Sequence, residues 1–264
     1  AGRAVAAVVD LREAPDNAAL LAEANARGIT VHMGATVYTA RRDSERQSLC
    51  SIDIHRIDAQ GEAGELIAQT DCTVLAMSAG FMPAYQLACQ AGAKLDYDDD
   101  RAAFSLSGLP AGLVLAGSVN STHSLDAVLA DGRNAARAAL RYIEISADED
   151  EPAVCAAQVN HPWPIFPHPK GREFVDFDED LQIKDIVNAT RLGYRDVQLV
   201  KRYSTVGMGP SQGRHAALPT ARLVAKATER TVSETGVTTA RPPVKPETLG
   251  HIAGRRFHPH RHTA

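Results

Sequence analysis

The sequence predicts an α/β fold in two parts, and three features indicate it. Up to residue 145, short apolar runs alternate with helical periods, which is the order that builds a largely parallel sheet covered by helices. Residues 146–172 then contain five prolines and the only tryptophan, so we expect a linker or arm there. Residues 173–236 have helical periods, and residues 237–264 are rich in Pro, Arg and His, as expected of a further linker.

The chain begins with the pattern of a βαβ unit. Residues 4–11, "AVAAVVDL", form an apolar run that ends with an acid, as buried parallel strands do. The stretch "DNAALLAEANARG" predicts a helix that ends at Gly28, and "ITVHMGATV" predicts the next strand.

The remaining elements of the first part follow in order. "SLCSIDIHRI" alternates and precedes the polar turn "DAQGEAGE", which predicts a hairpin. The runs "CTVLAMSAG" and "GLVLAGSV" are typical of buried strands. "PAYQLACQAG" predicts a short helix stopped by Gly92, and "NSTHSLDAVLADGRNAARAALRYI" predicts a long amphipathic one.

Charge and composition narrow the classes of function. The net charge of −4 leaves no basic footprint for nucleic acid, and no apolar run has the length of a membrane span. Cys50, Cys72, Cys89 and Cys155 have no regular spacing, so we expect buried thiols in a reducing cytoplasm. Because the chain opens with Ala inside an apparent strand, we expect an internal fragment.

Two places in the first part are candidates for binding a dinucleotide. Asp10 ends a strand where a carboxylate can accept from ribose hydroxyls, although it also fits a solvated acid. Gly117 opens a small-residue turn before a helix, where free N–H groups suit a pyrophosphate or ribityl chain, or form an ordinary strand–helix turn. Flavoprotein reductases with two dinucleotide domains end in this way, usually with Asp after Ala-Gly. Ser118 stands there instead, which weakens the case for FAD and leaves room for another dinucleotide.

The second part resembles a small helical 2Fe–2S module that lacks its cysteines. The module reads Cys-x-Cys-Glu-Asp at its start and Gly-x-Cys-Gln-Gly-x-x-Cys at its end, since a cluster needs four thiolates. The four thiolate positions fall here on Asp176, Asp178, Ser211 and Ala216. We therefore expect the scaffold without an iron–sulfur cluster. A hard cation on the two carboxylates is a weaker alternative, and we predict no metal.

The stretch "LVKRYSTVGMGPSQGR" collects cations and donors. Lys201, Arg202 and Arg214 are cationic, and Ser204, Thr205 and Gln212 carry donor groups. Such a set suits a phosphate-bearing cofactor or the acidic surface of a partner, and it also fits a basic helix end on the surface.

Four stretches together resemble the α subunit family of bacterial heterotetrameric sarcosine oxidases. They are "MSAGFMPAYQLACQAGAKLDYDDDRAAF", "WPIFPHPKGREFVDFDEDLQIKDI", "LVKRYSTVGMGPSQGRHAALPTARLVAKATERTV" and "GVTTARPP…PETLGHIAGRRFHP". The resemblance implies the C-terminal part of a fold with two dinucleotide domains, like FAD/NAD reductases, followed by the helical module. It also implies a T-protein-like domain beyond residue 264.

The resemblance further implies that the chain is part of a cytoplasmic enzyme and is inactive alone. A β subunit would oxidise sarcosine at FAD, FMN at the α/β interface would reduce oxygen to peroxide, and tetrahydrofolate would take the one-carbon unit. The α subunit would bind NAD, and smaller subunits would complete the assembly. The expected contacts are Asp10, Gly117 and Asn120 for NAD, and Lys201, Arg202, Thr205, Gln212, Thr239 and Arg241 for FMN. Part of a related amino-acid or opine dehydrogenase and a non-catalytic dinucleotide-binding scaffold are the alternatives.

Overall fold

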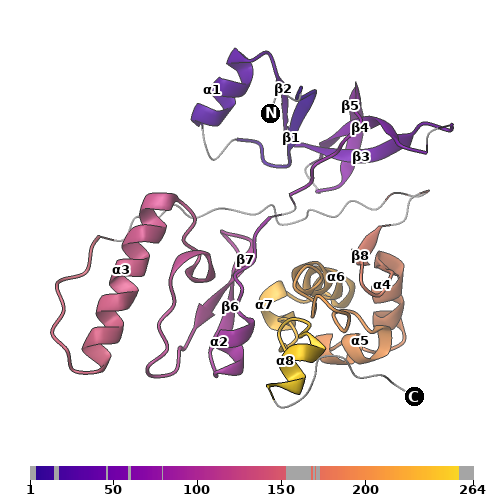
Figure 1. Cartoon of the computed structure of the whole chain (residues 1–264). Helices are drawn as coiled ribbons and strands as arrows, with labels where there is room; N and C mark the ends of the chain where they lie inside the picture. Colours follow the sequence, from indigo (N-terminus) through magenta and orange to yellow (C-terminus); the bar gives the residue numbers. More distant parts are fainter. Residues whose placement is uncertain are drawn as a thin grey trace. The chain divides into compact units, whose positions relative to one another are not determined.

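The fold is that of a computed structural model, which describes residues 4–14, 18–45, 47–58, 61–78, 80–152, 168, 170 and 173–255. Its internal contacts divide the chain into two units (Figure 1). Unit 1 comprises Ala1–Met82, Asp98–Ala103 and Ala156–Glu173, and unit 2 comprises Pro83–Tyr97, Phe104–Cys155 and Phe174–Ala264. The long predicted helix before residue 145 therefore groups with the helical module, not with the opening βαβ unit.

Unit 1 opens with the predicted βαβ unit. Strand β1 (Ala7–Asp10) runs parallel to β2 (Thr30–Met33), and α1 (Ala18–Ala26) connects them. Gly28 has φ +69°, a conformation that glycine adopts without strain, so the chain can turn from α1 into β2 there.

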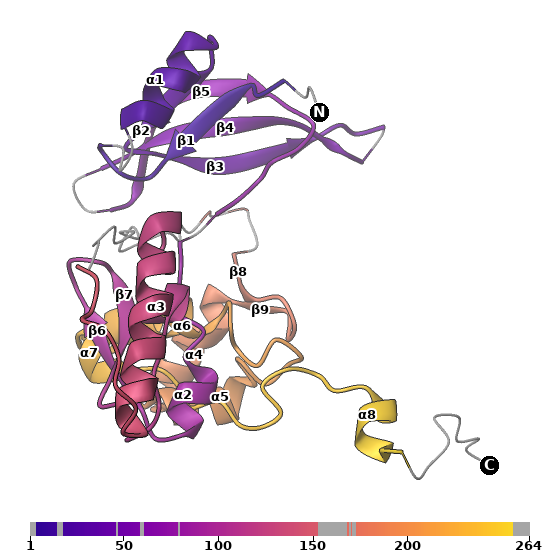
Figure 2. The ribbon, with the colours of Figure 1, turned by 60° about the vertical axis from the view of Figure 1, so that its left-hand side comes forward.

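Three antiparallel strands, in the order β3-β4-β5, form the second sheet of unit 1 (Figure 2). They are β3 (Ala35–Arg42), β4 (Leu49–Ile57) and β5 (Ala63–Asp71), and the β4–β5 hairpin is the predicted one. Their core consists of Ala35, Ile52 and Ile54, against which Val9 of β1 packs. The hydrophobic side chains of β4 thus attach the opening βαβ unit to the antiparallel strands.

Two predicted strands are absent from the described residues. Residues 72–78 are irregular, with Val74 and Met77 more than two-thirds exposed, and "GLVLAGSV" is irregular up to the 3-10 helix η1 (Gly117–Asn120). Both predictions were wrong because an apolar run forms a strand only beside neighbouring strands that pair its backbone groups. In the described part of the chain, β1 and β2 pair only with each other.

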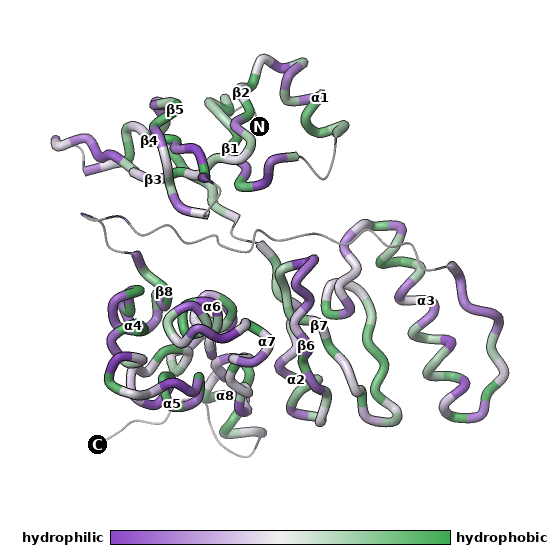
Figure 3. The backbone as a smooth tube through the Cα atoms, turned by 180° about the vertical axis from the view of Figure 1, so that it is seen from behind, coloured by the Kyte–Doolittle hydropathy of each residue, from purple (hydrophilic) through white to green (hydrophobic). Residues whose placement is uncertain are grey.

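Unit 2 begins with α2 (Gln86–Gln90), which ends before Gly92 as predicted. A pair of strands that the sequence analysis missed follows, β6 (Lys94–Asp98) and β7 (Ala103–Ser107). Helix α3 (Leu125–Tyr142) begins after Ser124, whose hydroxyl accepts from the backbone N–H of Ala127. Polar and apolar residues alternate along α3 (Figure 3), in agreement with the predicted amphipathic helix.

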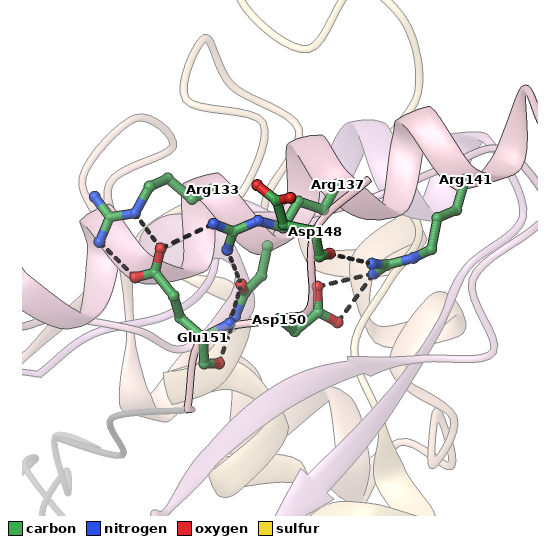
Figure 4. A network of polar contacts seen from close by, with 7 residues as sticks. Arg133, Arg137, Arg141, Asp148, Asp150 and Glu151 are labelled. Carbon is green, nitrogen blue, oxygen red and sulfur yellow. Dashed lines mark hydrogen bonds and ion pairs between the residues drawn. The ribbon is translucent and has the colours of Figure 1, made fainter. Parts of the chain in front are cut away.

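An arginine ladder on α3 holds the acidic segment that follows it (Figure 4). Arg133 binds Glu151 in a bidentate pair at 2.6 Å, and Arg137 contacts the same carboxylate at 3.2 Å. Arg141 binds both carboxylate oxygens of Asp150. Spacing of four residues puts the three guanidinium groups on one helix face. Arg133, and then Arg137, lower the pKa of Glu151 to about 2.

We expect the double variant Arg133→Gln, Arg137→Gln to release this acidic segment. Cleavage after Glu149 by a protease specific for acidic residues, followed by mass spectrometry at neutral pH, should become several-fold faster, because a folded segment is cut mainly after local opening. Arg27→Gln removes an exposed ion pair with Glu23 on α1 and serves as the control. Equal cleavage rates after Glu149 in the wild type, the double variant and the control would contradict the idea that the arginines hold this segment.

The ion pairs of Glu151 also predict how the stability of the folded state depends on pH. Because the carboxyl pKa is lowered in the folded state, the stability that Glu151 contributes is present above the usual carboxyl range. It is lost as pH falls through about 2.

The helical module completes unit 2. A short antiparallel pair, β8 (Phe174–Asp176) and β9 (Leu181–Gln182), leads into the helices. These are α4 (Ile183–Arg191), α5 (Val197–Ser204), α6 (Ala217–Thr228), α7 (Val232–Thr235) and α8 (Leu249–Ala253). Helices α4 and α5 pack on α6 around Ile186, Val200 and Val224, all fully buried. The helical periods predicted for residues 173–236 are confirmed by α4 to α7. Helix α8 lies in the predicted linker 237–264 and was not predicted, and β8 and β9 are too short to produce a pattern.

Two further expectations concern the cysteines and membrane spans. Cys50 is exposed, which corrects the expectation of buried thiols, and Cys72 and Cys89 are half-buried. Cys155 lies outside the described residues. Among the described helices, none combines the length and the apolar character needed to cross a membrane.

Candidate functional site

Asp10 lies at the end of β1, as expected, but its carboxylate is already engaged. The Arg12 guanidinium donates to both carboxylate oxygens, at 2.9 and 2.7 Å, and the Arg12 backbone N–H donates at 3.0 Å. The hydrogen bond to Asp10 raises the pKa of Arg12. A ligand hydroxyl at Asp10 would therefore share the carboxylate with this arginine.

The turn that begins at Gly117 is closed by an acid from α3. Gly117 has φ +77°, and its N–H donates to Asp131 Oδ2 at 2.7 Å. The side chain of Asn120 donates to the other oxygen of Asp131 at 3.2 Å. The structure thus brings Gly117 and Asn120 together around a residue that the sequence analysis missed. The periodic pattern of α3 gave no reason to single out one of its acids.

The four thiolate positions of the module converge in unit 2. Asp176 is fully buried, and its Oδ2 accepts the backbone N–H of Gly207 at 2.6 Å. Its Oδ1 accepts the N–H of Asp178 at 2.9 Å, and Asp178 Oδ2 accepts the N–H of Ser211 at 2.7 Å. Both carboxylates therefore reach from the β8 turn to the loop before α6, which they connect by hydrogen bonds.

Close packing and charge reinforce this connection. A Cβ atom on Gly209 would lie 2.3 Å from Cβ of Asp178, so the loop approaches the turn as closely as glycine allows. The Ser211 hydroxyl, and then its backbone N–H, lower the pKa of Asp178. Ala216, the fourth thiolate position, is fully buried and offers no ligand atom. These donors do not fit a four-thiolate cluster.

His215 joins the two aspartates, which the sequence analysis did not foresee. Its Nε2 lies 3.6 Å from Asp176 Oδ1, and ligand atoms of Asp176, Asp178 and His215 lie within 4.8 Å of one another. Three such groups could hold a metal ion. The oxygens of Asp176 already accept backbone N–H groups, however, so the buried carboxylate is satisfied without an ion.

Two of the predicted FMN residues form a cationic pair. Lys201 on α5 is half-buried, and its pKa is lowered, mainly by burial and also by the nearby charge of Arg241. Within the described residues, neither side chain makes an ion pair with a carboxylate. Since like charges repel, a second cation whose charge reaches Lys201 favours an anion beside the two.

The other predicted FMN residues differ in exposure, backbone conformation and hydrogen bonding. Arg202 and Thr239 are exposed. Thr205 ends α5 with φ +68°, and its hydroxyl donates to Glu179 at 3.0 Å, a contact that places a carboxylate beside the loop. Gln212 is half-buried with φ +55°. Glu179 is a further residue that the sequence analysis did not connect with this loop.

The chain is similar to several known proteins. Residues 170–255 match the family model described as the sarcosine oxidase A3 domain. The chain is 35% identical over 216 residues to the alpha subunit of a sarcosine oxidase from Rhizobium meliloti, covering 79% of this chain and 21% of that protein. It is 28% identical over 264 residues to the corresponding protein of Corynebacterium sp. strain U-96, covering 95% of this chain and 27% of that protein.

Two other proteins extend the comparison. The A subunit of an opine oxidase from Rhizobium meliloti is 27% identical over 193 residues, covering 66% of this chain and 42% of that protein. An L-proline dehydrogenase from P. horikoshii has a similar fold, with a TM-score of 0.66 and 21% identity over 94% of this chain and 49% of that one. The chain spans less than a third of the sarcosine oxidase subunits that it matches.

Proposed function

Since the chain is homologous to part of sarcosine oxidase α subunits, we propose that it is the portion of such a subunit that binds dinucleotide and flavin cofactors. Sequence similarity over most of the chain supports a role in an amine oxidoreductase. In the assembled enzyme, a β subunit would oxidise sarcosine to glycine with peroxide formation, and tetrahydrofolate would take the one-carbon unit. This chain would contribute position and charge rather than a catalytic residue.

The cationic pair Lys201 and Arg241 is the observation that carries the FMN assignment. A phosphate monoester carries close to two negative charges at neutral pH and has several acceptor oxygens. The two side chains would neutralise it with charge-assisted hydrogen bonds. Arg202, Thr205, Gln212 and Thr239 would complete the site around the same loop. FMN, when bound, would supply the electron transfer to oxygen, with the β subunit on its other side.

The turn at Gly117 is the proposed NAD site. Asp131 already holds the N–H of Gly117 and the amide of Asn120, so the turn presents a carboxylate there. A carboxylate suits ribose hydroxyls, which donate, better than pyrophosphate, which repels it. We therefore propose that Gly117 and Asn120 face the ribose of NAD.

The module carries no iron–sulfur cluster in this proposal. Carboxylate, hydroxyl and methyl groups at its four positions cannot replace thiolates, and the Asp176 and Asp178 carboxylates are used to hold the loop.

Co-expression of the full-length α subunit with its β and smaller subunits tests the function. We expect sarcosine-dependent peroxide formation, with FMN and NAD recovered from the complex in amounts comparable to FAD. Omitting the α subunit should abolish peroxide formation, since the route to oxygen would be lost. An assembled complex that contains FAD but neither FMN nor NAD would refute the proposal.

A role in an opine oxidoreductase is the second candidate. Similarity to the A subunit of opine oxidase over 66% of the chain supports it. The same complex assayed with an opine and an artificial electron acceptor would separate the two. Turnover of the opine without turnover of sarcosine would favour the second candidate.

A further inference from the structure

Two cysteines lie opposite each other at one end of the β4–β5 pair, Cys50 near the start of β4 and Cys72 directly after β5. Ser51 pairs with Asp71, and one residue further the backbone N–H of Cys72 donates to the carbonyl oxygen of Cys50 at 3.0 Å. Opposite residues of an antiparallel pair share one face, with Cα atoms roughly 5.5 Å apart when hydrogen-bonded. A disulfide spans Cα separations of about 4.4–6.8 Å. The Cα separation expected of such a pair therefore lies within the range that a disulfide spans.

The two thiols differ in a way that suits successive reactions. Cys50 is exposed, and its Sγ donates to the carbonyl oxygen of Arg41 on β3 at 3.4 Å. Cys72 is half-buried and packs against the core of Ile52 and Ile54. Because β4 lies between β3 and β5, rotation of the Cys50 side chain away from β3 turns its sulfur toward Cys72.

Cys50 is the thiol that a hydroperoxide in solvent can reach, because it is exposed. Its thiolate is the nucleophile in thiol oxidation.

We propose that Cys50 and Cys72 form a peroxide-responsive dithiol. The Cys50 thiolate attacks a hydroperoxide, forming an S–O bond as the O–O bond breaks, and gives a sulfenic acid plus hydroxide, or an alkoxide from an alkyl hydroperoxide. Cys72 then loses its proton and attacks the Cys50 sulfur. The S–S bond forms as the S–O bond breaks, and water leaves. The peroxide is reduced by two electrons while the two thiols are oxidised to one disulfide.

The proposed oxidase function enters only as the source of peroxide, because an oxidase would release it close to this chain. The chemistry itself depends on the geometry of unit 1. It can therefore be tested with added peroxide, on the chain alone and without flavin.

The experiment treats the whole chain, in a Cys155→Ser background, with hydrogen peroxide and follows its mass. We expect a loss of about 2 Da and a peptide that links Cys50 to Cys72 under non-reducing digestion. Cys72→Ser should stop at a sulfenic acid on Cys50, which dimedone traps. Cys50→Ser should prevent the disulfide. Cys89→Ser, the matched control, should form the same disulfide at the same rate.

Three outcomes would overturn the proposal. One is a wild-type chain in which Cys50 reaches the sulfinic acid while Cys72 stays reduced. A second is disulfide formation only between chains, and the third is a Cys50–Cys72 bond that forms no faster than any bond to Cys89. None of these results bears on the proposed function, and a complex without oxidase activity would leave the dithiol standing.

Discussion

Replacing Asp176 with Ala is expected to destabilise the helical module more than any other single change in its loops. The substitution removes the carboxylate that accepts the buried Gly207 N–H and also accepts the Asp178 N–H. A buried donor left unsatisfied costs about 1–3 kcal/mol, so we expect the free energy of unfolding to fall by about 2–4 kcal/mol. Urea unfolding, followed by circular dichroism of the helices, would measure it.

Two variants separate the hydrogen bonds from the loss of charge. Asp100→Ala makes the same change of charge in an exposed turn of the chain and should leave stability within about 0.5 kcal/mol. Asp176→Asn keeps one oxygen but puts an amide donor against an N–H, so its stability should lie between wild type and Asp176→Ala. If Asp176→Ala unfolds at the wild-type urea concentration, the carboxylate does not hold the loop.

The helices of the module could be predicted from the sequence, but the contacts between its loops could be predicted only in part. Periodic residues such as Ile186 and Val200 face a shared core, and this pattern is visible in the sequence. The convergence of Asp176 with Gly207 depends on a loop with positive φ angles at Thr205, Gly207 and Gln212, for which local propensity gives little signal.

The part of the chain up to residue 145 shows what local sequence patterns can and cannot predict. The βαβ unit and the β4–β5 hairpin depend on local patterns, and both were predicted from them. The runs at residues 72–80 and 112–119 have the composition of buried strands, but a strand also needs paired neighbours. Which strands lie beside a run is decided by the whole fold, so composition alone misassigned both.

The turn at Gly117 could be predicted only in part, because the residue that closes it is distant in sequence. Gly117 could be chosen because a strand–turn–helix pattern surrounds it. Asp131 lies 14 residues later and could not, because only the curvature of the chain into α3 brings its carboxylate under the turn. Glu179 and His215 were missed for the same reason. The bond of Glu179 to Thr205 crosses 26 residues, and the bond that His215 Nε2 accepts from the backbone N–H of Phe177 crosses 38.

The double variant Lys201→Ala, Arg241→Ala is expected to abolish FMN retention in the assembled enzyme. Each cation would make a charge-assisted hydrogen bond to the phosphate worth about 1.5–3 kcal/mol. Losing both should weaken FMN binding roughly 10²–10⁴-fold, since each 1.4 kcal/mol is a factor of about ten. FMN content after gel filtration and peroxide output with sarcosine would measure the loss. Reduction of FAD by sarcosine should be nearly unchanged, because that site lies in another subunit.

Matched variants decide whether the pair, rather than general positive charge, is responsible. Arg191→Ala removes an exposed cation at the end of α4 and should leave FMN content unchanged. Arg202→Ala, beside Lys201 but exposed, should have a smaller effect than either member of the pair. Burial and Arg241 lower the pKa of Lys201 from 10.5, so FMN affinity should decline at alkaline pH as Lys201 loses its proton. That decline should disappear in Lys201→Ala. Full FMN content in the double variant would mean that Lys201 and Arg241 are only a basic surface.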